Sequence, residues 1–262
     1  MTVPDFISKK EQQIPIAMIT SYDSWSAALI EQSGIDCILV GDSGAMVMHG
    51  FESTVSATMD MMEMHVAAVR RGAPESFIIG DFPFLANQGS QDIIYDHARR
   101  LMQAGANAVK MEGAGSILPT VKNLVEAGVP VMGHLGLTPQ SVNQFGGYKV
   151  QGRGEAAHEK LLADAAALEE AGCFAIVAEC VPAELGRELS SRLYIPVIGI
   201  GAGKDTDGQV LVLHDMLGLS PGRNPRFVRQ YLDGSSLIAE ALKRYSEDVK
   251  DRSFPDDSES YR

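Results

Sequence analysis

The stretch QAGANAVKM, residues 103–111, joins the end of an amphipathic helical pattern to an apolar run through Gly105. Three other stretches repeat this junction: QSGIDCILV (32–40), EAGVPVMGH (126–134) and EAGCFAIVA (170–178). In each stretch the glycine fits a left-handed helix cap that is followed directly by a buried strand. The repetition indicates a chain in which helices and strands alternate.

Eight apolar runs rich in β-formers lie along the chain. They are IAMIT (16–20), CILVG (37–41), FIIG (77–80), NAVKME (107–112), PVMGH (130–134), FAIVAE (174–179), PVIGI (196–200) and VLVLH (210–214). Most are continuous rather than alternating, which is typical of a sheet covered on both faces. Helical patterns occupy residues 57–71, 91–104 and 155–171.

This order predicts an α/β fold, a (β/α)8 TIM barrel with an N-terminal helix and a C-terminal helix near residues 225–249. A doubly wound open sheet is the second choice, since strand number and a length of 262 residues favour the barrel. We expect residues 1–262 to form a single barrel domain. The polar, acidic residues 250–262 are expected to form a disordered tail.

The composition narrows the class of protein. A formal net charge of −12 argues against nucleic acid or an anionic membrane as the main partner. The start, MTVPDFISKKEQQ, has no apolar signal core, and no run approaches the roughly 20 apolar residues of a membrane span. The cysteines, Cys37, Cys173 and Cys180, form no C-x-x-C pair and are expected to be reduced thiols. We therefore expect a cytoplasmic protein.

Polar residues stand where the predicted strands end. They are Asp23, Asp42, Ser43, Asp81, Lys110, Glu112, His134 and Glu179. Active sites of TIM barrels lie at these carboxyl ends. Crowded carboxylates repel one another, so they must be protonated, exposed or matched by cations. Lys110 supplies one positive charge, and oxygen ligands favour Mg²⁺ over zinc. The sequence thus predicts a magnesium site, with a water-exposed rim of ordinary charges as the alternative.

A long glycine-rich connection, residues 135–154, follows the fifth predicted strand. Loops of this length are uncommon inside compact domains and often serve function. The alternative is an ordinary surface excursion.

Several stretches, in this order and spacing, resemble the ketopantoate hydroxymethyltransferase family over nearly the whole chain. The most specific are VGDS (40–43), DFPF (81–84), GHLGLTPQSVNQFGGYKVQGRG (133–154), ECVP (179–182) and IPVIGIGAGKDTDGQVLV (195–212). The resemblance implies a barrel of the phosphoenolpyruvate/pyruvate type. It implies a one-carbon transferase of pantothenate biosynthesis, which uses Mg²⁺, 3-methyl-2-oxobutanoate and 5,10-methylenetetrahydrofolate to make 2-dehydropantoate through a stabilised enolate. It also implies a homo-oligomer, typically a decamer.

The resemblance also suggests roles for individual residues. Asp42 and Asp81 match direct metal ligands, through which the substrate is held, and Glu112 matches a third metal-associated carboxylate. Ser43 and Lys110 match contacts to the substrate carboxylate. Glu179 matches the general base. His134 is a candidate for ordering this face of the site, with a structural histidine as the alternative.

The chain departs from the family pattern after the second strand. The family often has leucine and glycine where this chain has Gly44 and Ala45, and Met48 and His49 also differ. We expect these changes to alter the local shape of the pocket.

Two other functions are compatible with such a barrel. A lyase of the isocitrate lyase or phosphoenolpyruvate mutase type would share the fold, Mg²⁺ and the enolate. A non-catalytic barrel could serve as a metal-binding scaffold.

Overall fold

The structure is a computed structural model that describes residues 1–220, 222 and 225–261. Its contacts divide the chain into two compact units, Met1–Val212 and Leu213–Arg262. The two units are described separately below. Within the described residues no helix is long and apolar enough to cross a membrane.

The first unit contains a closed barrel of parallel strands that pair in the order of the sequence, β1 to β8. The strands are β1 (Ile16–Thr20), β2 (Cys37–Val40), β3 (Phe77–Asp81), β4 (Ala108–Glu112), β5 (Val131–Gly136), β6 (Ala175–Glu179), β7 (Val197–Ile200) and β8 (Gly208–Leu211). The barrel closes where Ile16 of β1 pairs with Gly208 of β8. The predicted barrel is confirmed, and the open sheet is excluded.

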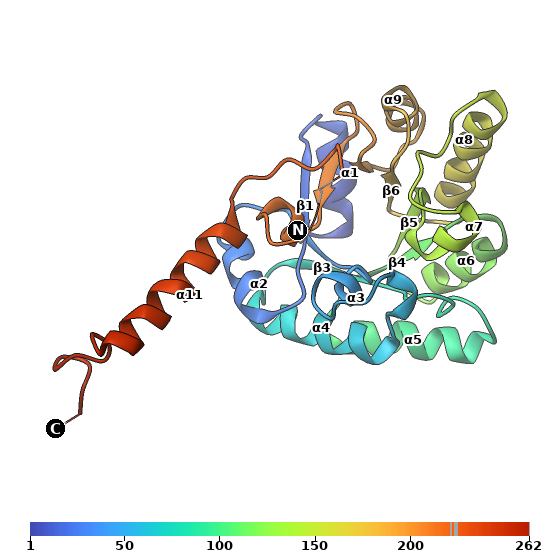
Figure 1. The fold of residues 1–262 in the computed structure, drawn as a ribbon. Helices are drawn as coiled ribbons and strands as arrows, with labels where there is room; N and C mark the ends of the chain where they lie inside the picture. Colours follow the sequence, from blue (N-terminus) through green and yellow to red (C-terminus); the bar gives the residue numbers. More distant parts are fainter. Residues whose placement is uncertain (221, 223–224, 262) are drawn as a thin grey trace. The chain divides into compact units, whose positions relative to one another are not determined.

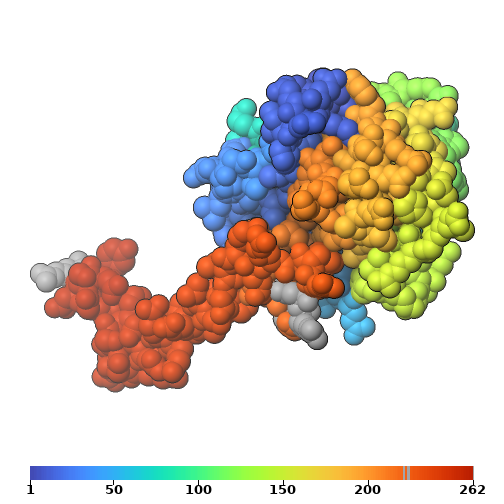
Figure 2. Space-filling view, turned by 90° about the horizontal axis from the view of Figure 1, so that it is seen from above, coloured from blue at the N-terminus to red at the C-terminus, as the bar shows by residue number. Residues whose placement is uncertain are grey.

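Helices surround the strands of this unit (Figure 1). They are α1 (Val3–Glu11), α2 (Ser24–Glu31), α3 (Gly44–Val47), α4 (Met59–Gly72), α5 (Gln91–Ala104), α6 (Leu118–Glu126), α7 (Val142–Phe145), α8 (Glu155–Glu170) and α9 (Ala183–Arg192). Short 3-10 turns lie at Thr54–Ser56 (η1), Gly115–Ile117 (η2) and Pro139–Ser141 (η3). In Figure 2 the blue N-terminal residues lie beside orange residues near position 200, as the barrel closure requires.

The repeated helix–strand junction is built as the sequence predicts. The glycines Gly34, Gly105, Gly128 and Gly172 have φ angles of 78°, 118°, 88° and 99°. These angles lie in the left-handed region that a residue with a Cβ rarely adopts. Each glycine therefore reverses the chain from the end of a helix into the next strand.

The interior of the barrel is apolar toward the amino ends of the strands. Side chains of alternate strand residues point inward, among them Phe77 and Ile79 of β3. Phe6 of α1 joins this interior cluster with no exposed surface. Its ring lies 5.2 Å from that of Phe77 and 5.0 Å from that of Phe174, both edge to face. Helix α1 thus closes the amino end of the barrel with one aromatic side chain.

The second unit contains α10 (Leu213–Met216) and α11 (Gly234–Asp251). Helix α11 begins later than the predicted helix at 225–249, because Asp233 caps it by accepting a hydrogen bond from the backbone N of Ser236. It also ends later than predicted, at Asp251.

In the first unit, the eighth strand differs from the predicted run at 210–214. Pairing with both neighbouring strands holds residues 208–211 as β8. The single-domain description and the disordered tail stay predictions.

We predict that Phe6→Ala destabilises the protein by about 3–5 kcal/mol, because it leaves a cavity between two other buried rings. Urea unfolding followed by far-UV circular dichroism measures the change. Phe6→Leu is the matched variant and should cost less, because it refills most of the volume. Equal stability of wild type and Phe6→Ala would show that α1 does not close the barrel.

Candidate active site

A layer of charged side chains continues the interior rows of the barrel toward the carboxyl ends of the strands. Asp81 follows Phe77 and Ile79 at the next inward position of β3. Lys110 and Glu112 follow Ala108 on β4 in the same way, and Glu179 continues the row of β6. Because side chains alternate between faces with a period of two, these residues must point inward. The barrel therefore changes from apolar to charged within one layer.

The strand register brings Asp81 and Lys110 together. These residues are paired neighbours on β3 and β4, and Lys110 Nζ lies 2.8 Å from Asp81 Oδ2. Both side chains are almost fully buried. Burial alone would lower the pKa of Lys110, but the surrounding carboxylates, Asp81 first, raise it above its usual value. Lys110 is thus a permanent positive charge inside the barrel.

His134 connects Lys110 with Glu179. Lys110 Nζ lies 3.2 Å from His134 Nδ1, and His134 Nε2 lies 3.3 Å from Glu179 Oε2. His134 Nδ1 also lies 3.2 Å from Glu112 Oε1. In its neutral form the ring can accept from the Lys110 ammonium group at Nδ1, since an ammonium group can only donate. Burial, followed by the charge of Lys110, lowers the pKa of His134 and favours this neutral form. The histidine ring therefore lies between Lys110 and Glu179, and its Nε2 comes close to Glu179 Oε2 without a hydrogen bond.

The segment after β2 brings Asp42 and Ser43 to the same end. Asp42 is buried, and its backbone N–H points at Asp81 Oδ2 at 3.4 Å. The Ser43 hydroxyl lies 2.8 Å from the hydroxyl of Tyr22, a buried residue that follows β1. A Cβ on Gly44 would lie 2.8 Å from the Tyr22 ring. The glycine that departs from the family pattern thus leaves room for Tyr22 beneath Ser43.

Gln140, which sequence reasoning missed, links two of the predicted metal carboxylates. Its Nε2 donates to Asp42 Oδ2 and to the Phe82 carbonyl oxygen, both at 2.8 Å. Its backbone N–H donates to Glu112 Oε2 at 3.1 Å. Since both side-chain partners are acceptors, the amide must present its NH₂ group to them. The only sequence signal was its place at the start of the long connection after the fifth strand.

Asp23, in contrast, does not join this layer. Its carboxylate accepts hydrogen bonds from the backbone N and the hydroxyl of Ser26, at 2.9 and 3.0 Å. Asp23 therefore caps the amino end of α2. An aspartate at the end of a strand can cap the next helix when it directly precedes it. The sequence pattern alone did not distinguish this structural role from a role in the site.

The buried carboxyl groups of the layer have raised pKa values. Burial, followed by the charges of Asp81 and Glu112, raises the pKa of Asp42 well above its usual value. Burial also raises the pKa of Asp81. It raises the pKa of Glu112 to about 7, against the opposing effect of Lys110. One buried lysine does not fully compensate three buried carboxyl groups, so the layer favours a further positive charge.

The carboxylate oxygens of this layer are suitable ligands for a hard cation, although they do not form a complete set of metal ligands in this structure. Among the described residues, Asp81 Oδ1 and Glu112 Oε1 are buried side-chain oxygens with no hydrogen-bond partner. Carboxylate oxygens are among the ligands that Mg²⁺ prefers. Within the same described part of the chain, no three Asp, Glu, His or Cys side chains are already placed to hold a metal ion. Gln140 hydrogen-bonds both Asp42 and Glu112 and so fixes the orientation of these two carboxyl groups.

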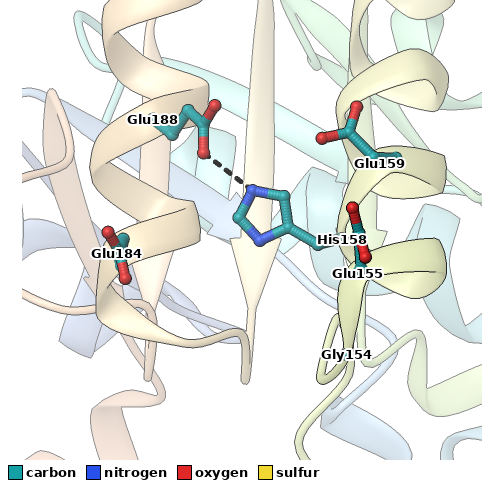
Figure 3. Close-up of a pocket in the computed structure, with 6 residues that line it drawn as sticks. All are labelled: Gly154, Glu155, His158, Glu159, Glu184 and Glu188. Atoms are coloured by element: carbon teal, nitrogen blue, oxygen red, sulfur yellow. Dashed lines mark hydrogen bonds and ion pairs between the residues drawn. The ribbon is translucent and has the colours of Figure 1, made fainter.

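A second concave region lies outside the barrel, between α8 and α9 (Figure 3). Its volume is about 400 Å³. Its lining residues are Gly154, Glu155, His158, Glu159, Glu184 and Glu188. His158 Nε2 lies 2.7 Å from Glu188 Oε2 and ties the two helices together. The other carboxylates line an open surface, so we interpret this region as a solvated acidic face.

Comparisons with known proteins agree with the geometry. The ketopantoate hydroxymethyltransferase family profile matches residues 1–257. A 3-methyl-2-oxobutanoate hydroxymethyltransferase of Legionella pneumophila is 52% identical over 262 residues, which is 100% of both chains. The protein of the same name from Shouchella clausii is 52% identical over 99% of this chain and 94% of its own length.

Solved structures resemble the fold at low sequence identity. Phosphonopyruvate hydrolase in complex with oxalate and Mg²⁺ matches with a TM-score of 0.64 and 12% identity, over 99% of this chain and 93% of that chain. A 2,3-dimethylmalate lyase of the PEP mutase/isocitrate lyase superfamily matches with a TM-score of 0.63 and 15% identity, over 94% and 88% of the two chains. At this identity the likeness shows the shared barrel alone.

We predict that Gln140→Met weakens binding of Mg²⁺ about tenfold or more, because second-layer hydrogen bonds to metal carboxylates typically matter by this factor. Methionine fills a similar volume and donates no hydrogen bond, so Asp42 loses its fixed orientation. Isothermal titration with Mg²⁺ measures the affinity. Gln103→Met, on the exposed surface of α5, is the matched control. Unchanged Mg²⁺ affinity in Gln140→Met would contradict this role.

We predict that Glu112→Gln stabilises the metal-free protein by about 3 kcal/mol at pH 8 and hardly at all near pH 4.5. A folded-state pKa of about 7, raised from 4.5, means that both states hold the proton below pH 4.5. Between these values only the unfolded state ionises, so the wild type loses stability as pH rises, and above pH 7 the loss is complete.

Urea unfolding in EDTA at pH 4.5 and pH 8 tests this pH dependence. Glu126→Gln, at an exposed position of α6, is the control and should show no pH-dependent gain. A Glu112→Gln protein with the same gain at both pH values would contradict a buried, proton-holding Glu112.

Proposed function

We propose that the charged layer of the barrel is the active site of this enzyme. The chain belongs to the ketopantoate hydroxymethyltransferase family, and it transfers a hydroxymethyl group to 3-methyl-2-oxobutanoate in pantothenate biosynthesis. We further propose that 5,10-methylenetetrahydrofolate is the one-carbon donor. The observation that carries the proposal is the unbroken series of contacts from Asp81 through Lys110 and His134 to Glu179. This series joins Asp81, a carboxylate that can bind a cation, with Glu179, a carboxylate that can accept a proton.

In this proposal Asp42, Asp81 and Glu112 hold Mg²⁺. The buried oxygens of Asp81 and Glu112 that lack a hydrogen bond support this assignment. When bound, Mg²⁺ supplies positive charge next to the oxo-acid oxygens, where negative charge develops as the substrate loses a proton. The Mg²⁺ complex of phosphonopyruvate hydrolase, which shares this fold, is consistent with such a site.

Ser43 and Lys110 bind the carboxylate of the oxo acid. Lys110 is buried and charged, and it is held at a fixed place by Asp81. The Ser43 hydroxyl can donate to the substrate because the Tyr22 hydroxyl, 2.8 Å away, can donate to Ser43 in turn. Anchoring at these two points fixes the carbon beside the ketone with respect to the rest of the layer.

Glu179 removes the proton from that carbon and becomes a carboxylic acid. Its side chain is less buried than the rest of the layer, with 17% of its surface exposed, so it lies on the side from which substrates enter. His134 is a positioning residue, because its Nε2 lies 3.3 Å from Glu179 Oε2 and the ring limits where that carboxylate can turn. The resulting enolate carbon then forms a bond to the methylene carbon of the donor. Both bonds from that carbon to folate nitrogens break, and a water molecule supplies the hydroxyl oxygen of the product. Of the three protons, two from water and one from Glu179, two go to the folate nitrogens and one stays on the new hydroxyl group.

We also propose that the protein assembles as a homodecamer and acts in the cytoplasm, as the family resemblance implies. Exposed apolar side chains on α2 support association with further copies, since Trp25 and Leu29 are 63% and 59% exposed.

One assay tests the proposed function. Purified enzyme is mixed with 3-methyl-2-oxobutanoate, 5,10-methylenetetrahydrofolate and Mg²⁺, and 2-dehydropantoate is measured by mass spectrometry. We expect product only when all three are present. Release of glyoxylate from a dicarboxylic acid without folate would favour the lyase. Absence of turnover and of proton exchange from the oxo acid would favour a non-catalytic barrel.

We predict that Glu179→Gln loses at least about a hundredfold in kcat while it still binds Mg²⁺ and the oxo acid, since general bases contribute about 10²–10⁴-fold. Exchange of the oxo-acid proton in D₂O, followed by NMR, isolates the step and should be lost in parallel. Glu184→Gln, an exposed glutamate on α9, is the control. Near-normal exchange in Glu179→Gln would remove this residue from the role of base.

A further inference from the structure

One loop of the barrel crosses over the charged layer. Residues 146–152, here called the mouth segment, follow α7 within the long connection after β5. The backbone N–H of Gln151 donates to the carbonyl oxygen of Cys180, directly after β6, at 2.9 Å. The Tyr148 hydroxyl lies 3.9 Å from Met46 Sδ, which belongs to α3 after β2. The segment therefore contacts the stretches of chain that follow two different strands, β2 and β6.

These two contacts lie on opposite sides of the mouth. In a closed barrel of eight strands, β2 and β6 are four steps apart in either direction. A segment that contacts the ends of both must pass over the opening between them. The raised pKa of Tyr148 is consistent with this path, since burial is its first cause and the charges of Glu179 and Asp42 follow. The Tyr148 hydroxyl is therefore within electrostatic reach of both sides of the proposed active site.

The ends of the mouth segment are fixed while its centre is open. Gly152 has a φ of 75°, and a Cβ there would lie 2.6 Å from Leu185, so the segment is packed closely against α9 at this point. At the other end, Gly147 N–H donates to the Val142 carbonyl oxygen of α7. Between these anchors Tyr148 keeps 56% of its surface exposed. An aromatic ring is thus presented to solvent at the mouth by a tethered backbone.

The charge of this region differs from that of the chain as a whole. The chain carries a net charge of −12, yet residues 135–154 contain no aspartate or glutamate and two basic residues, Lys149 and Arg153. Lys149 follows Tyr148 in the chain. An exposed aromatic ring and a basic residue on one short segment suit a ligand that combines a planar aromatic ring with an anionic tail.

We propose that the mouth segment is the docking surface for the one-carbon donor, with Tyr148 against its planar heteroaromatic ring and Lys149 facing its carboxylate tail. This inference rests on the proposed function, because it needs a second substrate that approaches the enolate carbon from the open side of the barrel. The oxo acid lies below the segment, among Ser43, Lys110 and Glu179. The methylene carbon of the donor would then meet the enolate beneath Tyr148.

Binding of tetrahydrofolate tests the role of the ring. The probe is tetrahydrofolate itself, titrated by calorimetry into enzyme that holds Mg²⁺ and 3-methyl-2-oxobutanoate. We expect Tyr148→Ala to weaken binding about tenfold or more, because stacking on one aromatic side chain is worth roughly this factor. Tyr148→Phe, which keeps the ring, should weaken it less than about threefold. Tyr194→Ala is the control, since Tyr194 is 65% exposed and precedes β7 at the amino end of the barrel.

Proton exchange separates donor docking from enolisation. The oxo-acid proton exchanges into D₂O without the donor, so Tyr148→Ala should lose much more donor affinity than exchange rate. Wild-type tetrahydrofolate affinity in Tyr148→Ala, or an equal loss of affinity and exchange, would overturn the inference while the proposed function stands. A wild-type enzyme that exchanges no proton and makes no 2-dehydropantoate would overturn both.

The anionic tail provides an independent test. Tetrahydrofolate with three glutamate residues carries more carboxylates than the form with one, so it should bind more tightly to the wild type in low salt. Lys149→Gln should reduce this advantage about two- to fivefold, in line with the loss of one exposed charge pair. Lys204→Gln is the control, because Lys204 is an exposed lysine on the loop after β7 and lies beside Asp205. An unchanged advantage in Lys149→Gln would remove Lys149 from the docking surface.

Discussion

The buried charge of Lys110 is the constraint on which the rest of the site depends. A single ammonium group stands among Asp42, Asp81 and Glu112, and each uncompensated ion inside a protein costs several kcal/mol. Burial raises the pKa values of these three carboxyl groups, and the charge of Lys110 only partly opposes it. The carboxyl groups can lose their excess negative charge by binding protons or by binding a cation. Protons and a metal ion therefore compete for this site, which suits an enzyme that must stabilise negative charge during its reaction.

The strands of the barrel fix the positions of the charged residues around Lys110. Its strand register places Asp81 beside Lys110 and Glu112 beside His134, so the contacts of the site are set by backbone pairing. The same inward rows are apolar one layer lower, where Phe6 closes the opposite end. The apolar layer excludes water from beneath the charges and strengthens their interactions. Stability and chemistry thus come from successive positions of the same strands.

The loops of this barrel make contacts at the site that the strands alone do not provide. Structures that share the barrel at 12–15% identity include a hydrolase and a lyase, so the fold alone does not decide the reaction. In this chain Gln140 and the mouth segment come from one connection after β5. That connection reaches the proposed metal ligands Asp42 and Glu112 at one end and contacts the segments after β2 and β6 near the other. The extent of its contacts explains why a barrel would keep so long a loop.

The sequence by itself determined the alternation of helices and strands, the four glycine caps and the set of polar residues at the strand ends. These features are local, since they depend on hydrophobic runs, on the conformational freedom of glycine and on the period of two along a strand. The tertiary structure alone decided that Asp23 caps a helix, that Tyr22 lies against Ser43, and that Gln140 reaches Asp42, 98 positions away. It also decided that Tyr148 crosses to Met46. Such contacts depend on the path of a loop and on the closure of the barrel, and no local pattern of residues encodes either.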